Sequence, residues 1–193
     1  MGLRCFYRKI KMKYSYYHIP NFHSVHECQA ILNFCLDNVN NSIDDFPAID
    51  VVKTSKVKYC FFGNVKEALD KIKHMTLDIN RQFFGFELFE KSNYDTANIN
   101  EYSAENNSEY GWHSDGNLGG VWDSKLTVIL NLSQETYEGG DFELFLNKPV
   151  KIEEFKETGS LIIFPSFIHH RVTPVTKGKR TTLSQWFLGP NFR

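Results

Sequence analysis

From Gly85 onward, apolar and polar residues alternate in short runs that are separated by turn-forming residues. Successive side chains of a β-strand point to opposite faces of its sheet, so each run predicts a strand with one buried face. Phe and Tyr, which strands favour, are abundant, with 17 and 9 copies among 193 residues. The pattern predicts a mainly β protein built as a double-stranded β-helix, a jelly-roll or cupin-like barrel. The predicted strands are 86–90, 97–102, 126–132, 141–146, 160–164, 169–175 and 181–188.

The first half of the sequence predicts two helices that pack outside this barrel. Ser24 and Glu27 have the spacing of a capping box, in which each side chain bonds to the other residue's backbone N–H. Asn64 and Glu67 repeat this spacing. Apolar residues at helical intervals follow both pairs, so each helix is expected to bury one stripe. A short strand is expected between the helices, at 59–62.

Size, charge and cysteine usage are those of an ordinary globular domain. The chain has 22 Lys and Arg against 23 Asp and Glu, which gives a formal net charge of −1. This balance does not indicate nucleic-acid or membrane-surface binding. The sequence has no apolar run long enough to span a membrane and no secretory signal. Its four cysteines match no zinc motif. We therefore expect one cytoplasmic domain with reduced thiols.

Three residues of the later sequence could share a metal ion. His113 and Asp115 lie two positions apart, and in an extended chain such residues point to the same side. His169 and His170 lie on a late predicted strand, where only one of two neighbours can face inward. His170 shares its face with apolar Val172, which favours His170. Two histidines and one carboxylate leave open positions on an octahedral metal, which suits non-haem Fe(II) better than a four-ligand structural zinc site.

Arg180 follows His170 by ten residues and stands just after the turn at 177–179. A hairpin at that turn would bring the guanidinium back beside His170. A guanidinium can grip a carboxylate through two parallel hydrogen bonds. The sequence therefore predicts an anion-binding arginine next to the metal site.

Three segments resemble a known family. Residues 170–180, HRVTPVTKGKR, resemble the distal motif of the bacterial PKHD-type hydroxylases. Residues 137–142, YEGGDF, resemble their hairpin of tyrosine, glutamate and two glycines, and residues 18–28 resemble their first strand and helix. The chain thus resembles, over about residues 17–189, the Fe(II)- and 2-oxoglutarate-dependent dioxygenases of the prolyl 4-hydroxylase-like branch.

The resemblance implies a reaction and four catalytic residues. Fe(II) would be held by His113, Asp115 and His170, and Arg180 would pair with the far carboxylate of 2-oxoglutarate. With O2, the family decarboxylates 2-oxoglutarate to succinate and CO2 and hydroxylates a substrate. The resemblance also implies ascorbate as a reductant that helps to keep the iron ferrous.

Three further residues are implied at the cosubstrate site. Tyr102 matches a tyrosine with which many relatives hydrogen-bond the cosubstrate. Asn131 matches an inward-facing position that a tyrosine fills in some relatives. Trp186 matches a tryptophan that lines the pocket of some prolyl hydroxylases. The implied cofactor-binding residues are therefore Tyr102, Asn131, Trp186 and Arg180.

Substrate and partners are open to several readings. Prolyl hydroxylation of a protein or peptide is the first expectation, and a free amino acid, a small metabolite, a non-catalytic metal-binding module and a zinc hydrolase are the alternatives. Asp115 argues against a halogenase. Trp186, at a position where nucleic-acid demethylases carry a second arginine, argues against nucleic acid. We expect a single domain over residues 1–193 with a catalytic core at about 85–189. The expected rim loops of the pocket are 91–97, 103–110 and 116–125.

Overall fold

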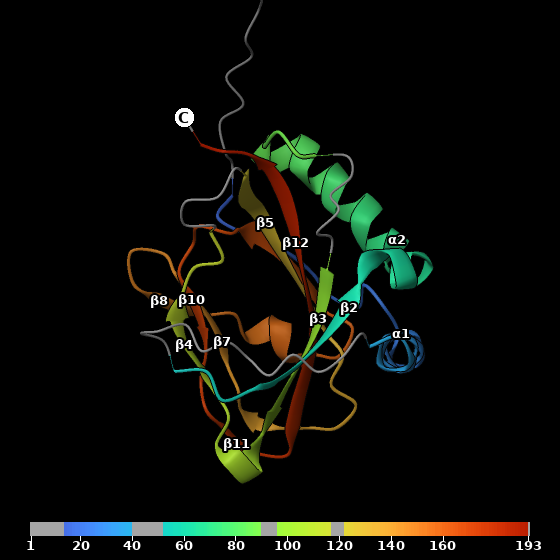
Figure 1. Ribbon diagram of the computed structural model, residues 1–193. Coiled ribbons are helices and arrows are strands. Elements are labelled where there is room, and N and C mark those ends of the chain that lie inside the picture. Colours follow the sequence, from blue (N-terminus) through green and yellow to red (C-terminus); the bar gives the residue numbers. More distant parts are fainter. Residues whose placement is uncertain (1–13, 40–51, 90–95, 117–121, 193) are drawn as a thin grey trace, which may run out of the picture.

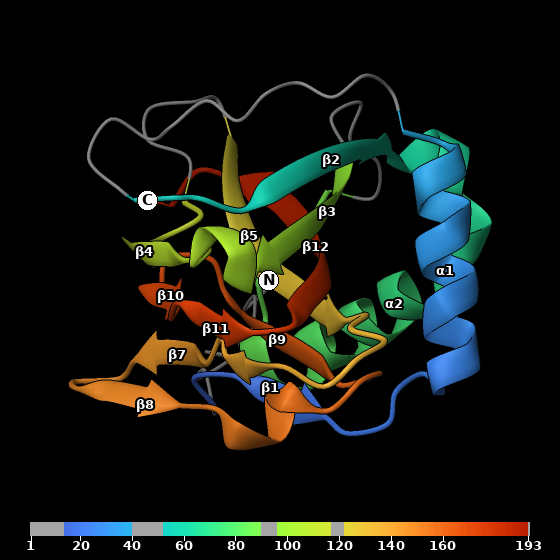
Figure 2. The same cartoon turned by 90° about the horizontal axis from the view of Figure 1, so that it is seen from below.

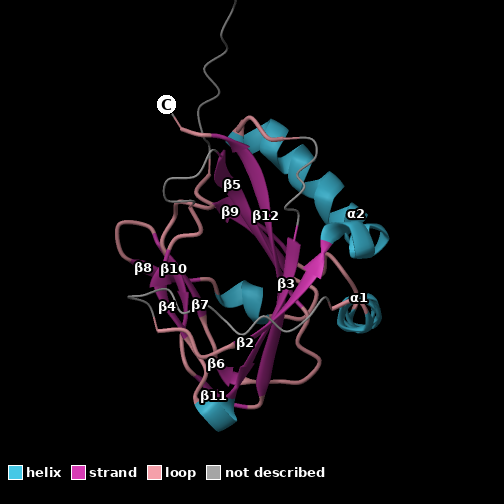
Figure 3. Cartoon of the chain, viewed as in Figure 1, coloured by secondary structure: helices cyan, strands magenta, loops and turns pink. Residues whose placement is uncertain are grey.

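The computed structural model describes residues 14–39, 52–89, 96–116 and 122–192. Two sheets face each other, and two helices cover the outer side of the larger sheet (Figures 1 and 3). The mainly β architecture with helices outside confirms the predicted fold, although the described strands do not close into one continuous barrel. The elements are β1 (Tyr17–Ile19), α1 (Val25–Asp37), β2 (Lys56–Phe61), α2 (Phe62–Ile79), the π-helical turn η1 (Asn80–Phe84), β3 (Thr96–Ser103), η2 (Ala104–Asn106), β4 (Tyr110–His113), β5 (Trp122–Asn131), β6 (Glu138–Gly139), β7 (Phe142–Phe145), β8 (Pro149–Lys151), η3 (Glu153–Lys156), β9 (Leu161–Pro165), β10 (His170–Val172), β11 (Val175–Lys177) and β12 (Lys179–Pro190).

The larger sheet has six strands in the order β1-β9-β5-β12-β3-β2. Helices α1 and α2 lie on one side of it, and the smaller sheet lies on the other (Figure 2). In strand β9, alternate side chains pack on the two opposite faces of this sheet. Leu161 and Ile163 join the apolar core that includes the helices, whereas Ile162 and Phe164 join the core between the sheets. All four are fully buried, so the strand is covered on both faces.

The smaller sheet has the order β4-β10-β7-β8, and β11 pairs with β6 in a separate two-stranded ladder. Aromatic rings fill much of the space between the two main sheets. Phe142 contacts Phe155 and Phe164 at ring-centroid distances of 5.4 and 5.7 Å. Next to this aromatic core, the facing strands carry the polar side chains that form the candidate site.

The two predicted helix starts have different outcomes. The capping box of α1 is confirmed: Ser24 Oγ accepts from the Glu27 N–H at 3.2 Å, and Glu27 Oε2 accepts from the Ser24 N–H at 2.7 Å. These hydrogen bonds hold the pKa of Glu27 at about 2. The predicted cap of α2 is wrong, because β2 runs directly into the helix at Phe62 and Asn64 lies inside it.

Two of the predicted strands differ from the structure. Residues 86–89 are not a strand, because the side chain of Asn80 binds both the N–H and the C=O of Phe86, at 2.9 and 2.8 Å. The predicted strand 169–175 is divided into β10 and β11. Pro174 stands in the gap and has no N–H to donate to a ladder.

Three of the four cysteines lie in the described ranges. Cys28, Cys35 and Cys60 are buried free thiols, and Cys5 lies outside the described residues. The Cys60 thiol donates to the backbone oxygen of Cys35 at 3.1 Å. None of the helices in these ranges combines the length and the apolar character that a membrane crossing requires.

Candidate active site

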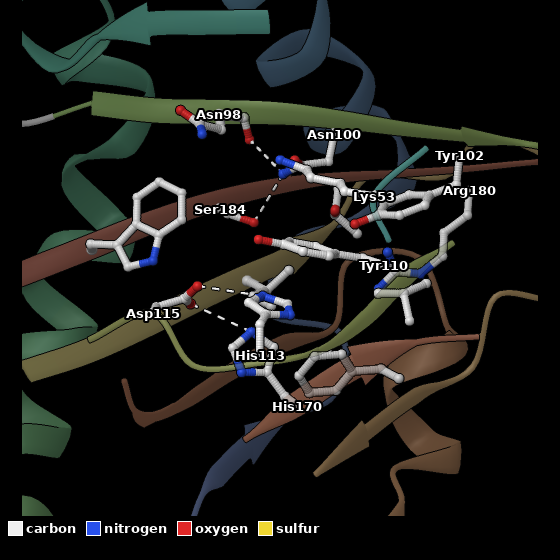
Figure 4. Close-up of a pocket in the computed structure, with 15 residues that line it drawn as sticks. Lys53, Asn98, Asn100, Tyr102, Tyr110, His113, Asp115, His170, Arg180 and Ser184 are labelled. Carbon is white, nitrogen blue, oxygen red and sulfur yellow. Dashed lines mark hydrogen bonds and ion pairs between the residues drawn. The ribbon is translucent and has the colours of Figure 1, made fainter. Parts of the chain in front are cut away.

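The three predicted metal ligands meet between the two sheets (Figure 4). His113 ends β4 and His170 begins β10, and the two residues are direct partners in the antiparallel ladder. Asp115 reaches the same point, and its backbone N–H donates to the oxygen of Ser166 at 2.9 Å. The candidate ligand atoms all lie within 4.8 Å of one another. At this spacing the three side chains can share one metal ion.

Backbone oxygens orient both imidazoles. Nδ1 of His113 lies 2.8 Å from the oxygen of Gly111, and Nδ1 of His170 lies 3.0 Å from the oxygen of Ile168. When Nδ1 donates to a carbonyl, Nε2 is the nitrogen that accepts a metal. Each Nε2 lies 3.5 Å from an oxygen of Asp115. The metal-binding atoms therefore converge without rotation of either ring.

Side chains from the larger sheet and the β9–β10 segment hold the carboxylate in place. Thr127 on β5 donates to Asp115 Oδ2 at 2.8 Å and shares a 2.9 Å hydrogen bond with the hydroxyl of Ser166. The side chain of Trp186 on β12 also hydrogen-bonds to Asp115. Thr127 and Ser166 are almost completely buried. The carboxylate is therefore held in position before any metal binds.

The electrostatics of the pocket keep the ligands in forms that bind a metal. Burial alone would raise the pKa of Asp115, but His170, His113 and the hydrogen bond from Trp186 together hold it well below its usual range. Burial lowers the pKa of His170 to about 4, even though Asp115 opposes the shift. At neutral pH the site therefore presents a carboxylate beside an uncharged imidazole, as a metal requires.

Strand alternation places the two adjacent histidines on opposite sides. His170 is 3% exposed and, like Val172, points into the core between the sheets. His169 is exposed to solvent. The structure therefore brings His170, and not His169, to the other two ligands, in agreement with the expectation from the sequence.

Arg180 lies in the same pocket as the triad. It pairs with Tyr102 across β12 and β3, and its guanidinium carbon lies 5.2 Å from the centroid of the Tyr102 ring. The side chain is 1% exposed, and its Nη2 has no hydrogen-bond partner among the described residues. A buried guanidinium nitrogen without a partner is costly, and a carboxylate would satisfy it. The pocket residues thus fit an anionic cosubstrate such as 2-oxoglutarate.

The glycine pair in the Tyr-Glu-Gly-Gly hairpin lets the chain pass close to this arginine. Gly139 and Gly140 both have positive φ, of 67° and 59°. A Cβ at Gly139 would lie 2.1 Å from the oxygen of Pro174, and one at Gly140 would lie 3.1 Å from Arg180 Cδ. Any larger residue would clash or displace the arginine, so the motif supports the anion-binding end of the pocket.

Six of the seven predicted site residues line one pocket, and Asn131 is set apart from them. Trp186 lies at the Asp115 end. Asn131 shares a strand face with Ile129, which lines the pocket, but its amide nitrogen donates to the backbone oxygens of Phe155 and Lys156 at 3.1 and 2.9 Å. Its side chain therefore braces η3 instead of facing the cosubstrate site.

The sequence analysis missed several residues of this pocket. On β3 and β12 the missed residues continue the alternation that Tyr102 and Arg180 begin, so strand periodicity could have found them. Lys53 comes from a polar segment without a pattern and gave no signal. The expected rim loops fall partly on 90–95 and 117–121, outside the described residues. The missed lining residues include Lys53, Asn98, Asn100, Tyr110, Thr182 and Ser184.

Comparison with known proteins finds a family match for the segment that carries this site. Residues 97–188 match the 2OG-Fe(II) oxygenase superfamily. A PKHD-type hydroxylase from Hyphomonas neptunium is 36% identical over 85 residues, which cover 40% of this chain and 36% of the relative. The match thus spans little more than a third of that relative's length.

Solved structures agree with the fold. A viral collagen prolyl hydroxylase from Paramecium bursaria Chlorella virus-1 has a TM-score of 0.69 and 20% identity and is aligned over 92% of this chain and 97% of its own. A prolyl-4-hydroxylase from Pseudomonas putida has a TM-score of 0.69 and 18% identity over 93% and 95%. Family and triad together support Fe(II) as the metal, with 2-oxoglutarate and O2 as cosubstrates. Over residues 97–188 the chain therefore resembles the 2OG-Fe(II) oxygenase superfamily, and the relatives that it matches are PKHD-type hydroxylases.

Proposed function

We propose that the protein is a Fe(II)- and 2-oxoglutarate-dependent hydroxylase that acts on a prolyl residue of a protein or peptide. The observation that carries the proposal is that a His–Asp–His triad and the buried Arg180 share one pocket. A facial triad with open positions suits Fe(II) and oxygen chemistry. The catalytic core would be the segment from about 85 to 189 of a single domain.

Each residue has a defined task in this proposal. His113, Asp115 and His170 would hold Fe(II), and Arg180 would hold the far carboxylate of 2-oxoglutarate, with Tyr102 beside it. When bound, the iron, 2-oxoglutarate and O2 supply the oxidising chemistry that yields succinate, CO2 and a hydroxylated substrate. The surrounding sheets exclude water and fix the positions of the ligands, as preorganised sites require.

The choice of a prolyl substrate is supported by the solved structures of similar fold, one named for collagen prolyl hydroxylation and one for prolyl 4-hydroxylation. Tyr110, Phe142 and Trp186 also line the pocket and offer apolar ring surfaces that fit a pyrrolidine ring. These surfaces would pack against the substrate while the triad and Arg180 serve the cofactor and cosubstrate.

Anaerobic titration with Fe(II) and then 2-oxoglutarate tests the class of enzyme. Chelation of 2-oxoglutarate by triad-bound iron should produce a weak visible absorption band. A panel of proline-containing peptides, assayed in air with ascorbate for succinate and for a mass gain of one oxygen atom, tests the substrate. Iron binding without the band would contradict the cosubstrate assignment.

Arg180→Gln and Arg81→Gln form a matched pair for this assay. Arg81 is exposed on η1, is not one of the residues that line the pocket, and pairs with Asp78. We expect Arg180→Gln to weaken 2-oxoglutarate binding by at least about tenfold, because a hydrogen-bonded charge pair is lost. Arg81→Gln should leave it unchanged. Circular dichroism verifies that both variants fold. Equal 2-oxoglutarate affinity in the two variants would contradict the role of Arg180 in binding this cosubstrate.

A further inference from the structure

The guanidinium of Arg180 stands between two cavities. Arg180 lines the pocket of the triad and also a second, smaller cavity, whose wall includes Tyr137, Gly140 and Phe155. In Figure 4 the arginine lies at the end of the first pocket that is opposite to Asp115. Its Nη2 has no hydrogen-bond partner among the described residues. Packing against its neighbours therefore has to keep this nitrogen on the side of the triad.

Two segments supply the packing on the side of the second cavity. The centroid of the Phe155 ring, on η3, lies 5.9 Å from the guanidinium carbon of Arg180. In the Tyr-Glu-Gly-Gly hairpin, a Cβ at Gly140 would lie 3.1 Å from Arg180 Cδ and 3.3 Å from Cε2 of Tyr137. The Phe155 and Tyr137 side chains are both buried. The position of the guanidinium thus depends on where η3 and this hairpin are held.

Asn131, at the end of β5, ties these two segments together. Its Nδ2 donates to the backbone oxygens of Phe155 and Lys156 at 3.1 and 2.9 Å and to the hydroxyl of Tyr137 at 3.3 Å. Its Oδ1 accepts from the Ser133 N–H at 3.0 Å. The side chain is fully buried, so no water competes for these groups. A single amide therefore holds both η3 and the hairpin, and its removal would release them together.

We propose that Asn131 is a positioning residue for Arg180 and that it thereby selects the chain length of the 2-oxo acid. By holding η3 and the hairpin against the guanidinium, it fixes the separation between the arginine and the metal site, and a fixed separation fits one length of acid. Without the amide, the guanidinium can move toward the second cavity. This inference rests on the proposed function, in which Arg180 holds the far carboxylate of 2-oxoglutarate.

Binding to the protein loaded with Mn(II) tests the inference without turnover. The ligands are 2-oxoglutarate and 2-oxoadipate, whose carboxylates are separated by one methylene more. For the wild-type protein we expect 2-oxoglutarate to bind at least about tenfold more tightly than 2-oxoadipate. Asn131→Ala should weaken 2-oxoglutarate binding by at least about tenfold and reduce this preference to about threefold or less. The affinity for Mn(II), measured in the same calorimetric experiment, should stay within about twofold, because the triad is unchanged.

Leu69→Ala is the matched control for a loss of stability alone. Leu69 is fully buried on α2 in the helix-covered core, so its truncation should destabilise the fold while both 2-oxo acids bind as they do in the wild-type protein. Phe155→Leu removes the ring beside Arg180 and keeps an apolar side chain on η3. It should also reduce the preference, and it decides the question if Asn131→Ala does not fold. Urea unfolding checks that each variant is folded under the binding conditions.

A double variant tests whether Asn131 acts through Arg180. In the Arg180→Gln background, Asn131→Ala should change 2-oxoglutarate affinity by less than about twofold, because two changes on one path are not additive. Equal losses in both backgrounds would overturn the inference. So would the absence of a preference in the wild-type protein, an unchanged preference in the folded variants of Asn131 and Phe155, or an equal loss of preference in Leu69→Ala.

These measurements separate the inference from the proposed function. If Arg180→Gln binds 2-oxoglutarate as tightly as the wild-type protein does, the cosubstrate role of the arginine fails, and the inference fails with it. If Arg180→Gln weakens binding and Asn131→Ala does not, the inference alone fails. Succinate formation with Fe(II) in air is measured separately. A chain-length preference that depends on Asn131, without succinate, would refute the hydroxylase function and keep the positioning role.

Discussion

The two faces of the six-stranded sheet differ sharply in chemistry, although the same strands build both. On β12, Leu183 and Phe187 join the apolar core that includes the helices. The alternate residues Arg180, Ser184 and Trp186 line the pocket. One face is completed within the chain by apolar packing. The other presents buried polar atoms, such as Arg180 Nη2, that lack a partner among the described residues.

Because the side chains of a strand alternate with a period of two, one face of the sheet can stabilise the fold while the other face forms the site. Adjacent residues on a strand face opposite layers, so a change of one position exchanges a packing residue for a site residue. Substitutions at neighbouring positions can therefore test the comparison directly, because they share a backbone and differ in the layer that they enter.

The largest effect is expected from the neighbouring pair His170 and His169. His170→Ala removes a ligand from the triad, so metal affinity should fall by more than about 100-fold and turnover should be lost. His169→Ala changes an exposed side chain and should largely keep both. Calorimetric Fe(II) binding under anaerobic conditions, together with succinate formation, measures both variants. The reverse result would show that His169, and not His170, faces the metal site, so that the strand register would be shifted by one residue.

Stability should show the opposite ranking at Leu183 and Ser184. Leu183 is fully buried beneath the helices, so Leu183→Ala should lower the free energy of unfolding by about 3 kcal/mol. Ser184 accepts a hydrogen bond from Asn100 in the pocket, and Ser184→Ala should cost about 1 kcal/mol or less. Urea unfolding of the metal-free proteins measures both. Similar losses of unfolding free energy at the two positions would contradict the view that one face of the sheet stabilises the fold and the other forms the site.

Much of the fold could be predicted from the sequence, because the alternation is set by burial on both faces of the strands. The prediction was wrong where a side chain competes for backbone groups. Asn80 takes both hydrogen-bonding groups of Phe86, and residues 86–89 therefore do not form a strand, although the Phe89 N–H donates to the oxygen of Leu188 on β12. Such a contact between a helical turn and the next segment has no periodic signature.

The candidate site shows a similar limit. The triad and Arg180 could be predicted from the sequence, because His113 and Asp115 lie two residues apart and Arg180 follows His170 by ten residues. The structure brings these side chains together in one pocket. Asn131 has the same alternation as Ile129, but the backbone of η3 occupies its amide. Lys53 lines the pocket because residues 52–54 pair with residues 109–111 through backbone hydrogen bonds. This pairing depends on tertiary structure and left no pattern in the sequence.

A smaller effect is expected from the hydroxyl that orients Asp115. Thr127→Val keeps the shape of the side chain and removes the 2.8 Å hydrogen bond to the carboxylate. Because partners that orient a ligand tune its affinity, Fe(II) binding should weaken by about tenfold. Thr176→Val, at an exposed position on β11, is the control. The role would be structural only if Thr127→Val changed the unfolding midpoint and left metal affinity intact.

The smallest effect concerns a titratable group at the edge of the helix-covered side. His23 is buried against Phe22, and burial, with Lys71, lowers its pKa below 6.5 although Glu27 opposes the shift. The unfolded state then binds a proton that the folded state does not, so this contribution to stability is present above pH 6.5 and is lost as the pH falls below it. His18 shifts in the same direction. The pKa of Glu27 is also lowered, so its contribution to stability is lost only when the pH falls below 4.5, outside the range of the histidines. Urea unfolding of the metal-free protein between pH 8 and about 5 should show a plateau and then a decline. His23→Phe should make the decline shallower, and an unchanged decline would show that His23 does not contribute to it.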